Sequence, residues 1–326
     1  MDNVFLGSSA VEQVAVNHWV GGSNPSRGAI FLDLLIMIID AKSKTFLVGE
    51  YCVTCGGSAI VLCTDPKFRL RIKSNKNTQL RGIKECSPAF AFYMENRQFF
   101  KNLFIKFIDP YKKTGGFGAS SAQFTILYKL RSNIIGENND INVSKFLDEY
   151  RSIAGKGQNI KPSGADCLAQ FQNNHIYFNS NANKIENLQW NFKDIDFLIF
   201  KTGNKVATHE HLRKLSPDFI CANSDHLNQI VERVRKAWIQ IDSENFVNNI
   251  MDFSASLNNL GLVCDKTQKL VSKILKIEGV LAAKGCGAMA SDTIIIIFEK
   301  KMRNKVINAM RNIFSFDSHW LSKKIN

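Results

Sequence analysis

The segment Thr114-Gly115-Gly116-Phe117-Gly118-Ala119-Ser120-Ser121-Ala122 is the most informative stretch of this 326-residue chain. Its three glycines allow the backbone to turn tightly and to approach a ligand closely. Two hydroxyl side chains follow, and the pattern of 122–130 predicts a helix that begins directly after the loop. A helix N-terminus presents unpaired N–H groups and a positive dipole end, which favour phosphate. The segment therefore predicts a phosphate-binding loop, and a Gly/Ser-rich surface turn is the alternative. It is not a Walker A motif, because no Gly-Lys-Ser/Thr ends it.

The rest of the chain mixes strand and helix patterns in irregular order, which favours an α+β fold over a doubly wound parallel sheet. Apolar, β-branched runs predict strands at 38–50, 58–64, 68–72, 197–200 and 294–298. Helical periodicity, with Asn142 or Ser144 as an N-cap for the first, predicts helices at 143–153, 226–238, 244–260, 267–277 and 305–313. Residues 162–166 predict a turn that enters a helix. The type of segment that begins at Phe90 stays open, and the apolar stretch 102–111 precedes the glycine loop.

Length and charge limit the possible functions. A chain of 326 residues exceeds one average domain, which favours two lobes. The 45% hydrophobic and 22% charged residues are typical of a globular protein. The formal net charge of +13 favours anionic partners, such as phosphorylated metabolites, nucleic acid or an acidic surface. A solvated basic surface is the alternative interpretation.

The eight cysteines are scattered, and the single C-x-x-C pair of Cys52 and Cys55 has no second pair after it. We therefore expect buried small hydrophobic side chains rather than zinc or redox sites. Nothing in the sequence indicates export, so a reducing cytoplasm is the expected location.

Residues 1–36 form an expected extension of low order, rich in Gly, Ser and Asn over 1–28. The extension lacks the basic start of a signal peptide. The apolar run 29–39 is interrupted by Asp33 and is too short to span a membrane. A natural translation start at Met37 is an alternative.

The glycine loop resembles the phosphate-binding motif of the GHMP kinases, which reads roughly Gly-Leu-Gly-Ser-Ser-Ala-Ala. Alignment on Gly116-Phe117-Gly118 pairs the two family serines with Ala119 and Ser120, and alignment on Ser-Ser-Ala pairs them with Ser120 and Ser121. A loop serine helps to hold Mg²⁺ in the family, so the resemblance implies Ser120 first and Ser121 second as the metal ligand. It also implies that ATP phosphates bind the loop residues Gly115, Gly116, Gly118, Ala119, Ser120 and Ser121.

Two further segments are similar to family motifs. Residues 44–51 look like the first motif, Lys-x-x-Leu-x-Gly-Glu-Tyr/His, and 53–59 match its continuation in part. Pro162-Ser163-Gly164-Ala165-Asp166 resembles the segment that carries the catalytic aspartate. The resemblance implies catalytic roles for Lys44 and Asp166 and substrate contacts for Ser163 and Gly164. Without it, Lys44 would be interpreted as a solvated strand-end lysine and Asp166 as a helix first-turn acid.

Two more segments follow in the family order. Residues 202–208 look like the start of the second lobe and imply a substrate contact at Thr208. The adjacent His209 and His211 are two apart and would face different sides of a helix, so a metal site is disfavoured. Residues 283–292 resemble the third motif through Lys284, Gly287, Ala288 and Asp292, of which the first three are candidate substrate contacts. Family glycines are replaced by Met289, Ala290 and Ser291, and a left-handed backbone would be strained at Met289.

The resemblance covers 37–326 and implies two lobes: an ATP-binding lobe at 37–190 and a ferredoxin-like lobe at 191–326. It implies a cytoplasmic, ATP- and Mg²⁺-dependent kinase whose acceptor is phosphomevalonate, because the Ser-Gly-Ala-Asp form is nearer to those members. A mevalonate acceptor and a non-catalytic binding protein are the alternatives. We expect a monomer or homodimer without membrane or nucleic-acid partners, since Lys and Arg are spread along the chain.

Overall fold

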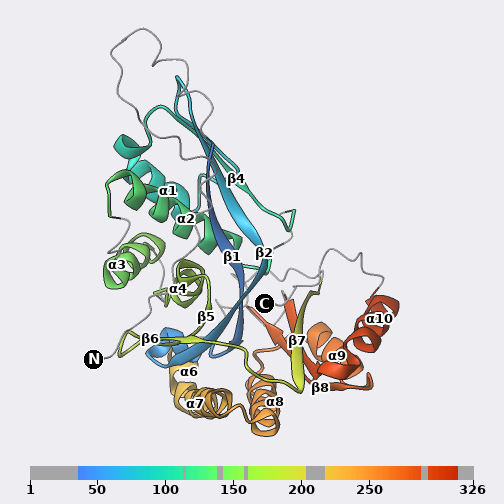
Figure 1. The fold of residues 1–326 in the computed structure, drawn as a ribbon. Helices are drawn as coiled ribbons and strands as arrows, with labels where there is room; N and C mark the ends of the chain where they lie inside the picture. The colour runs from blue at the N-terminus through green and yellow to red at the C-terminus, as the bar shows by residue number, and fades with distance from the viewer. Residues whose placement is uncertain are drawn as a thin grey trace, which may run out of the picture.

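The computed structural model describes residues 36–112, 115–137, 142–157, 161–202, 217–287 and 293–314. These residues form two sheets with helices packed on them (Figure 1), so the predicted α+β fold is confirmed. One sheet has six strands and the other has three. No helix in the described ranges has the length and apolar character needed to cross a membrane. The predicted extension lies outside these ranges, apart from Ile36.

The long strand β2 (Ser58–Ser74) organises the first sheet. β1 (Met37–Val48) pairs with it antiparallel from Val48↔Ile60 to Met37↔Ile72. β4 and β5 also pair with β2. Because a strand has two edges, both lie on the edge of β2 opposite β1, β5 beside the start of β2 and β4 beside its end. The remaining strands of this sheet are β3 (Gln79–Arg81), β4 (Leu103–Ile108), β5 (His175–Asn179) and β6 (Lys184–Leu188).

Four helices of the first half cover one side of this sheet (Figure 1). The predicted N-cap Asn142 is confirmed, because its side chain accepts a hydrogen bond from Lys145 N. Aromatic rings fill the space between the helices, as where the Tyr128 and Phe146 rings meet edge to face at 4.9 Å. These helices are α1 (Pro88–Glu95), α2 (Ala119–Ile134), α3 (Val143–Ala154) and α4 (Ala165–Gln172).

The second sheet has the strand order β7-β9-β8, all antiparallel, and is buried on both faces. Successive side chains of a strand point to opposite faces, so Ile295 and Ile297 join the main core with α8, and Ile294 and Ile296 join a second core with α9 and α10. The elements are β7 (Ile195–Lys201), α8 (Ser243–Asn259), α9 (Asp265–Ile274), β8 (Val280–Cys286), β9 (Thr293–Glu299) and α10 (Arg303–Phe314).

Helix α7 (Ser224–Gln240) follows the estimated lobe boundary near residue 190 but packs on the first sheet. The Glu232 carboxylate accepts hydrogen bonds from Ser58 Oγ and Tyr177 Oη, each at 2.7 Å. Arg235 binds both oxygens of Glu186 at 2.6 and 2.7 Å, the bidentate geometry that suits a guanidinium. The division of the chain into 37–190 and 191–326 stays a prediction, because α7 belongs by contact to both halves.

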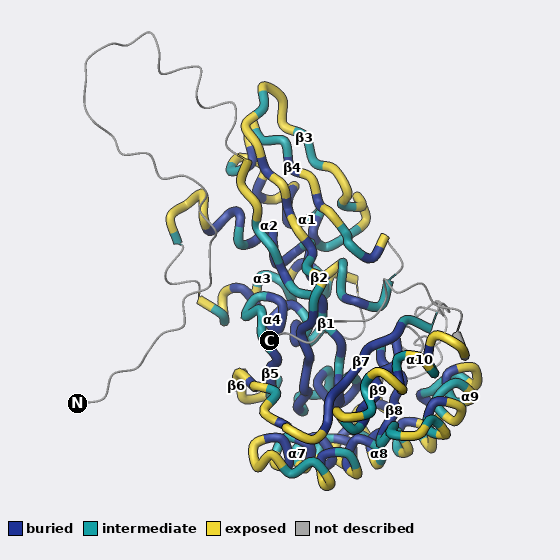
Figure 2. Tube along the Cα trace, turned by 45° about the vertical axis from the view of Figure 1, so that its right-hand side comes forward, coloured by how far each residue is buried: buried dark blue, intermediate teal, exposed yellow. Residues whose placement is uncertain are grey.

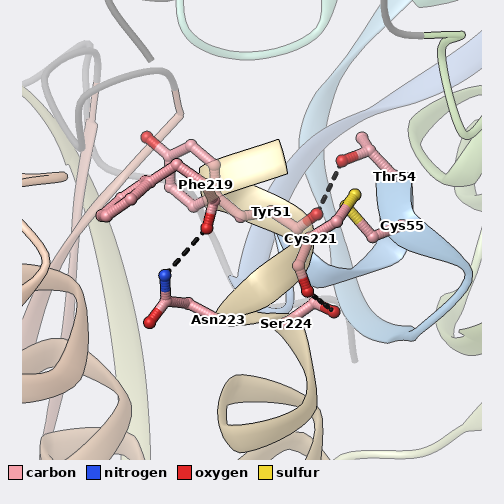
Figure 3. The surroundings of a disulfide bond; sticks show 7 residues. All are labelled: Tyr51, Thr54, Cys55, Phe219, Cys221, Asn223 and Ser224. Carbon is pink, nitrogen blue, oxygen red and sulfur yellow. Dashed lines mark hydrogen bonds between the residues drawn. A yellow bond between two sulfur atoms is a disulfide. The ribbon is translucent and has the colours of Figure 1, made fainter. Parts of the chain in front are cut away.

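A disulfide also joins the first half of the chain to the segment just before α7 (Figure 3). Cys55, at the end of the short helix η2 (Cys52–Cys55), is bonded to Cys221 in α6 (Pro217–Ala222). The expectation that the cysteines are small buried hydrophobic side chains is therefore wrong for these two. It describes four others, which are free and buried: Cys52, Cys63, Cys167 and Cys286.

Several predicted elements differ from the structure. The strands expected at 58–64 and 68–72 are one strand, β2, which continues through a bulge at 65–67, where three of its residues lie opposite Lys42 of β1. The segment at Phe90 is helical, started by the Ser87 cap. Strands β5, β6 and β8 were not predicted, because they are short or rich in Ala, Gly and Lys, and only pairing with neighbours makes them strands.

We expect Gly49→Ala to destabilise the protein severely. Gly49 has φ +94°, and an added Cβ would lie 2.3 Å from Ser58 O and 2.5 Å from Ala59 Cα. The matched control is Gly136→Ala, where φ is +79° but no atom lies within 4 Å. The control should lose about 1–2 kcal/mol of unfolding free energy from backbone strain alone. Urea unfolding of both variants measures the difference, and equal losses would contradict the steric explanation.

Candidate active site

The structure brings together the two residues predicted to be catalytic. Lys44 lies on β1, and Asp166 lies in the first turn of α4. The Lys44 Nζ and Asp166 Oδ2 atoms are 3.7 Å apart, with side chains 16% and 25% exposed. Residues 122 positions apart in sequence thus form an ion pair that remains open to a ligand.

The glycine loop lies directly against Lys44. Lys44 N donates a hydrogen bond to Phe117 O at 3.0 Å. Gly118 is the N-cap of α2 with φ +85°, and a Cβ atom there would lie 2.6 Å from Lys44 Cγ. Glycine is therefore favoured at this position by the left-handed backbone, and it leaves room for the Lys44 side chain that packs against it. The start of α2 and the ammonium of Lys44 form one electropositive surface.

The two candidate serines have different environments. The Ser121 side chain is buried, and its Oγ donates to Gly118 O at 3.0 Å, which closes the first turn of α2. Ser120 is exposed at the same helix N-terminus. The geometry therefore leaves Ser120, rather than Ser121, available to a phosphate or a metal ion. Ala119 is half-buried beside it, and Gly115 and Gly116 also have the left-handed backbone that the loop prediction needs.

Gln170 connects these segments and was missed by the motif comparison. Its Nε2 donates to Gly118 O at 3.1 Å and to Lys42 O at 2.9 Å, and its side chain is fully buried. The available sequence signal was its position four residues after Asp166, which places both on one face of α4. Gln170 fixes the relative positions of β1, the glycine loop and α4.

The turn that carries Asp166 is held from outside by α3. Gly164 has φ +80°, and a Cβ atom there would lie 2.5 Å from the Leu147 side chain. Arg151 donates from Nε and Nη2 to Ser163 O at 3.1 and 2.9 Å. Arg151 lies outside every motif, so no sequence pattern indicates this role. The arginine positions the turn, and the turn positions Asp166.

A cavity of about 670 Å³ lies against this turn. Its wall contains three cationic side chains, from Arg151, Lys156 and Lys161, and one acid, Asp148. Four hydroxyl residues also line it, together with the apolar Val53 and Pro162: Thr54, Ser152, Ser163 and Ser180. Most of its walls come from the segment after the first motif and the segment before Asp166. The excess of cations in these walls favours a small anionic molecule.

Lys284, a predicted substrate contact, is buried and paired inside the protein. Its side chain is 1% exposed, and its Nζ lies 2.5 Å from an oxygen of Glu50, whose side chain is 6% exposed. The Nζ also donates to Gly285 O at 2.9 Å and lies 5.5 Å from the centre of the Phe253 ring. This pair joins the first motif to the third motif across 234 positions. A substrate contact by Lys284 stays a prediction, and the structure instead gives its ammonium an internal partner.

The charge of Lys284 is maintained despite its burial. Burial lowers the pKa of Lys284, but the nearby Cys286 and Glu50 outweigh it, so the pKa is raised overall. Burial raises the pKa of the Cys286 thiol to about 11, so this thiol is neutral near pH 7. Glu50 is therefore the counter-ion that keeps Lys284 protonated.

Two predicted substrate contacts, Thr208 and Ala288, lie outside the described residues, as do the altered positions 289–291 and Asp292 of the third motif. Gly287 is described at the end of β8 with φ +87°. The predicted contact there stays a prediction, as do the roles of the other candidate site residues.

We expect Lys284→Met to lower the unfolding free energy by about 3–5 kcal/mol, because it leaves the buried Glu50 carboxylate without its partner. The double variant Glu50→Leu/Lys284→Met should recover much of this loss, since no buried charge remains. Chemical denaturation of these two variants and of Glu50→Leu gives the coupling free energy between the Glu50 and Lys284 side chains. Lys305→Met is the control, because its pair with Glu278 is exposed and should matter little. Additive losses in the double variant would contradict a buried ion pair.

No protein-family model and no curated protein sequence matches the chain. Solved structures do match over most of its length. Mevalonate kinase from Methanococcus jannaschii is 18% identical with a TM-score of 0.65, covering 86% of this chain and 96% of that one. Phosphomevalonate kinase from Streptococcus pneumoniae is 14% identical with a TM-score of 0.68, covering 85% and 96%.

Lactococcus lactis galactokinase, solved with galactose, is 13% identical with a TM-score of 0.68, covering 89% of this chain and 92% of that one. At these identities the likeness concerns the fold. The chain therefore has the two-sheet α+β fold of the mevalonate, phosphomevalonate and galactose kinases, the GHMP kinase fold that the sequence motifs implied.

Proposed function

We propose that this protein is an ATP-dependent kinase that transfers the γ-phosphoryl group to a small anionic acceptor, with phosphomevalonate as the first candidate. The observation that carries the proposal is the half-open Lys44–Asp166 pair at the start of α2. Phosphoryl transfer depends mainly on positioning and on neutralising negative charge. The site offers backbone N–H groups, a helix dipole and a lysine for that purpose.

The residues present fit ATP with Mg²⁺. Triphosphate oxygens would bind the N-terminus of α2, where the loop backbone is free of side chains at Gly115, Gly116 and Gly118. Mg²⁺ usually binds through substrate phosphates and few protein ligands. The exposed hydroxyl of Ser120 would complete its ligands. When bound, the ion neutralises charge on the phosphates, and Lys44 adds a second positive charge on the acceptor side.

The role of Asp166 depends on the acceptor. As the bond from Pγ to the ADP oxygen breaks, a bond forms from Pγ to the acceptor oxygen. A hydroxyl acceptor must lose a proton, which Asp166 would accept as a general base. A phosphate acceptor is mostly dianionic at pH 7 and needs no base, because its second pKa is about 6. Asp166 would then orient Lys44 and the acceptor.

The cavity beside the Asp166 turn supports an anionic acceptor. Arg151 already holds Ser163 O, and Lys156 lies 2.8 Å from the Glu95 carboxylate. Lys161 has no such ion pair among the described residues and lines the same cavity. A phosphorylated or carboxylated acceptor would give Lys161 a partner. The second candidate function is mevalonate phosphorylation, supported by the same pair and by the mevalonate kinase structures with this fold.

We expect Asp166→Asn to lower kcat at least a hundredfold and to change ATP affinity only a few-fold, because the lost interaction belongs to the transition state. The matched control is Asp225→Asn, which removes a first-turn acid of α7 away from the site. Steady-state ADP release and nucleotide titration measure both effects. Full kcat in Asp166→Asn would contradict the catalytic assignment.

The acceptor is identified by coupled ADP release with phosphomevalonate, mevalonate, homoserine and galactose. We expect the highest kcat/KM with phosphomevalonate, because its second anionic group fits the basic cavity. Faster turnover of mevalonate or galactose would reject that acceptor but keep the kinase proposal. ATP binding without turnover of any acceptor would indicate a binding protein instead.

A further inference from the structure

A group of exposed cations covers the end of the first sheet that is formed by β3, β4 and the second half of β2, on the side away from α1–α4. Three of them, Arg69, Arg71 and Lys73, alternate along β2 with buried apolar residues that face the helices. Lys106 on β4 and Arg81 on β3 continue the set and are also exposed. We call these five residues the basic face. Figure 2 shows the exposed positions along the upper strands.

The strand register places like charges directly side by side. Arg71 is paired with Lys106, and Lys106 is paired with Arg81, so three cations form one row across β2, β4 and β3. Neighbouring strands are about 4.8 Å apart. Like charges opposite each other destabilise a sheet. The row is therefore a cost to the folded protein that a bound anion would remove.

Acidic side chains do not neutralise this face within the described ranges. None of its five members makes an ion pair with a carboxylate there. The one acid in register with it is Asp40, opposite Arg69, and its carboxylate lies 3.0 Å from Lys67. Most of the charge of the basic face is thus available to a partner.

Apolar groups lie among the cations. The Phe104 ring is half-exposed, with Lys73 Nζ 5.2 Å and the Arg81 guanidinium 5.4 Å from its centre. Ile38, opposite Arg71, and Ile108, opposite Arg69, are 57% and 40% exposed. The face therefore offers one aromatic ring and aliphatic surface between positive charges.

We propose that the basic face binds single-stranded nucleic acid. Proteins that bind single strands combine cations that follow the phosphates with an aromatic ring on which a base stacks. Along β2 the cations recur about every 6.8 Å, two residues at about 3.4 Å each. A stretched single strand can place its phosphates along this line and its bases toward Phe104.

Two other polyanions fit less well. Arg and Lys side chains are longer than those of Phe and Ile on the same face of the sheet, so apolar groups would not reach into a lipid layer ahead of the cations. An acidic polypeptide offers carboxylates to the cations but has no bases to stack on the Phe104 ring. The expectation that Lys and Arg are merely spread along the chain misses this gathering, because residues 69–73, 81 and 106 meet only through strand pairing.

The test is fluorescence anisotropy of a labelled 20-nucleotide single-stranded RNA of mixed sequence, titrated with full-length protein at 50–200 mM salt. Five phosphate contacts predict a slope of log K against log salt of about −3.5. The variant Arg71→Gln/Arg81→Gln/Lys106→Gln should reduce the steepness of the slope by about 2. Its melting temperature should not fall, because repulsion is relieved.

The matched control is Lys266→Gln/Lys269→Gln/Lys273→Gln, which removes the same charge from the exposed side of α9 and should bind as the unchanged protein does. Phe104→Leu should weaken RNA binding about fivefold or more through lost stacking, with the salt slope unchanged. Equal losses in the α9 control would overturn the proposal. So would tighter binding of polyglutamate or of phosphatidylserine vesicles than of RNA. Kinase assays are independent of each outcome.

Discussion

The Lys44 side chain of β1 packs directly against the backbone of Gly118 at the start of α2, in the space that a side chain at Gly118 would occupy. This contact depends on Gln170, whose amide holds the carbonyl oxygens of Gly118 and Lys42 together. Three elements from distant parts of the sequence are thereby fixed at one point, and Asp166 lies one helical turn from Gln170 on α4. The geometry of the candidate site thus depends on the contact of Lys44 with the Gly118 backbone and on one buried amide.

The second constraint is the buried Glu50–Lys284 pair, which acts where the two sheets meet. Strand alternation turns Lys284 toward α8 and the first sheet, between the buried Ala282 and Cys286. The first motif is thus attached to the strand that leads into the third motif. Segments that border the expected nucleotide and acceptor positions are held at a fixed separation by a contact that is itself inaccessible to either molecule.

The sequence predicted those parts of the site that are contiguous in the chain. The glycine loop, the start of α2 and the turn before Asp166 are local, because glycine, hydroxyl and helix patterns determine them. Arg151, Gln170 and the partner of Lys284 could not be predicted, since their roles come from contacts between distant segments. The same reason explains why β5 and β8 were missed and why the basic face was interpreted as scattered charge.

Helix α7 has a consequence for how the protein is made. The chain is synthesised from its N-terminus at about 5–20 residues per second. Ser58 forms its hydrogen bond with Glu232, which is 174 residues later. The hydroxyl of Ser58 therefore waits on the order of 10–35 seconds, at that rate, for the carboxylate that pairs with it. During this interval the lower end of the first sheet is an uncovered surface on the ribosome, where a chaperone can bind the nascent protein.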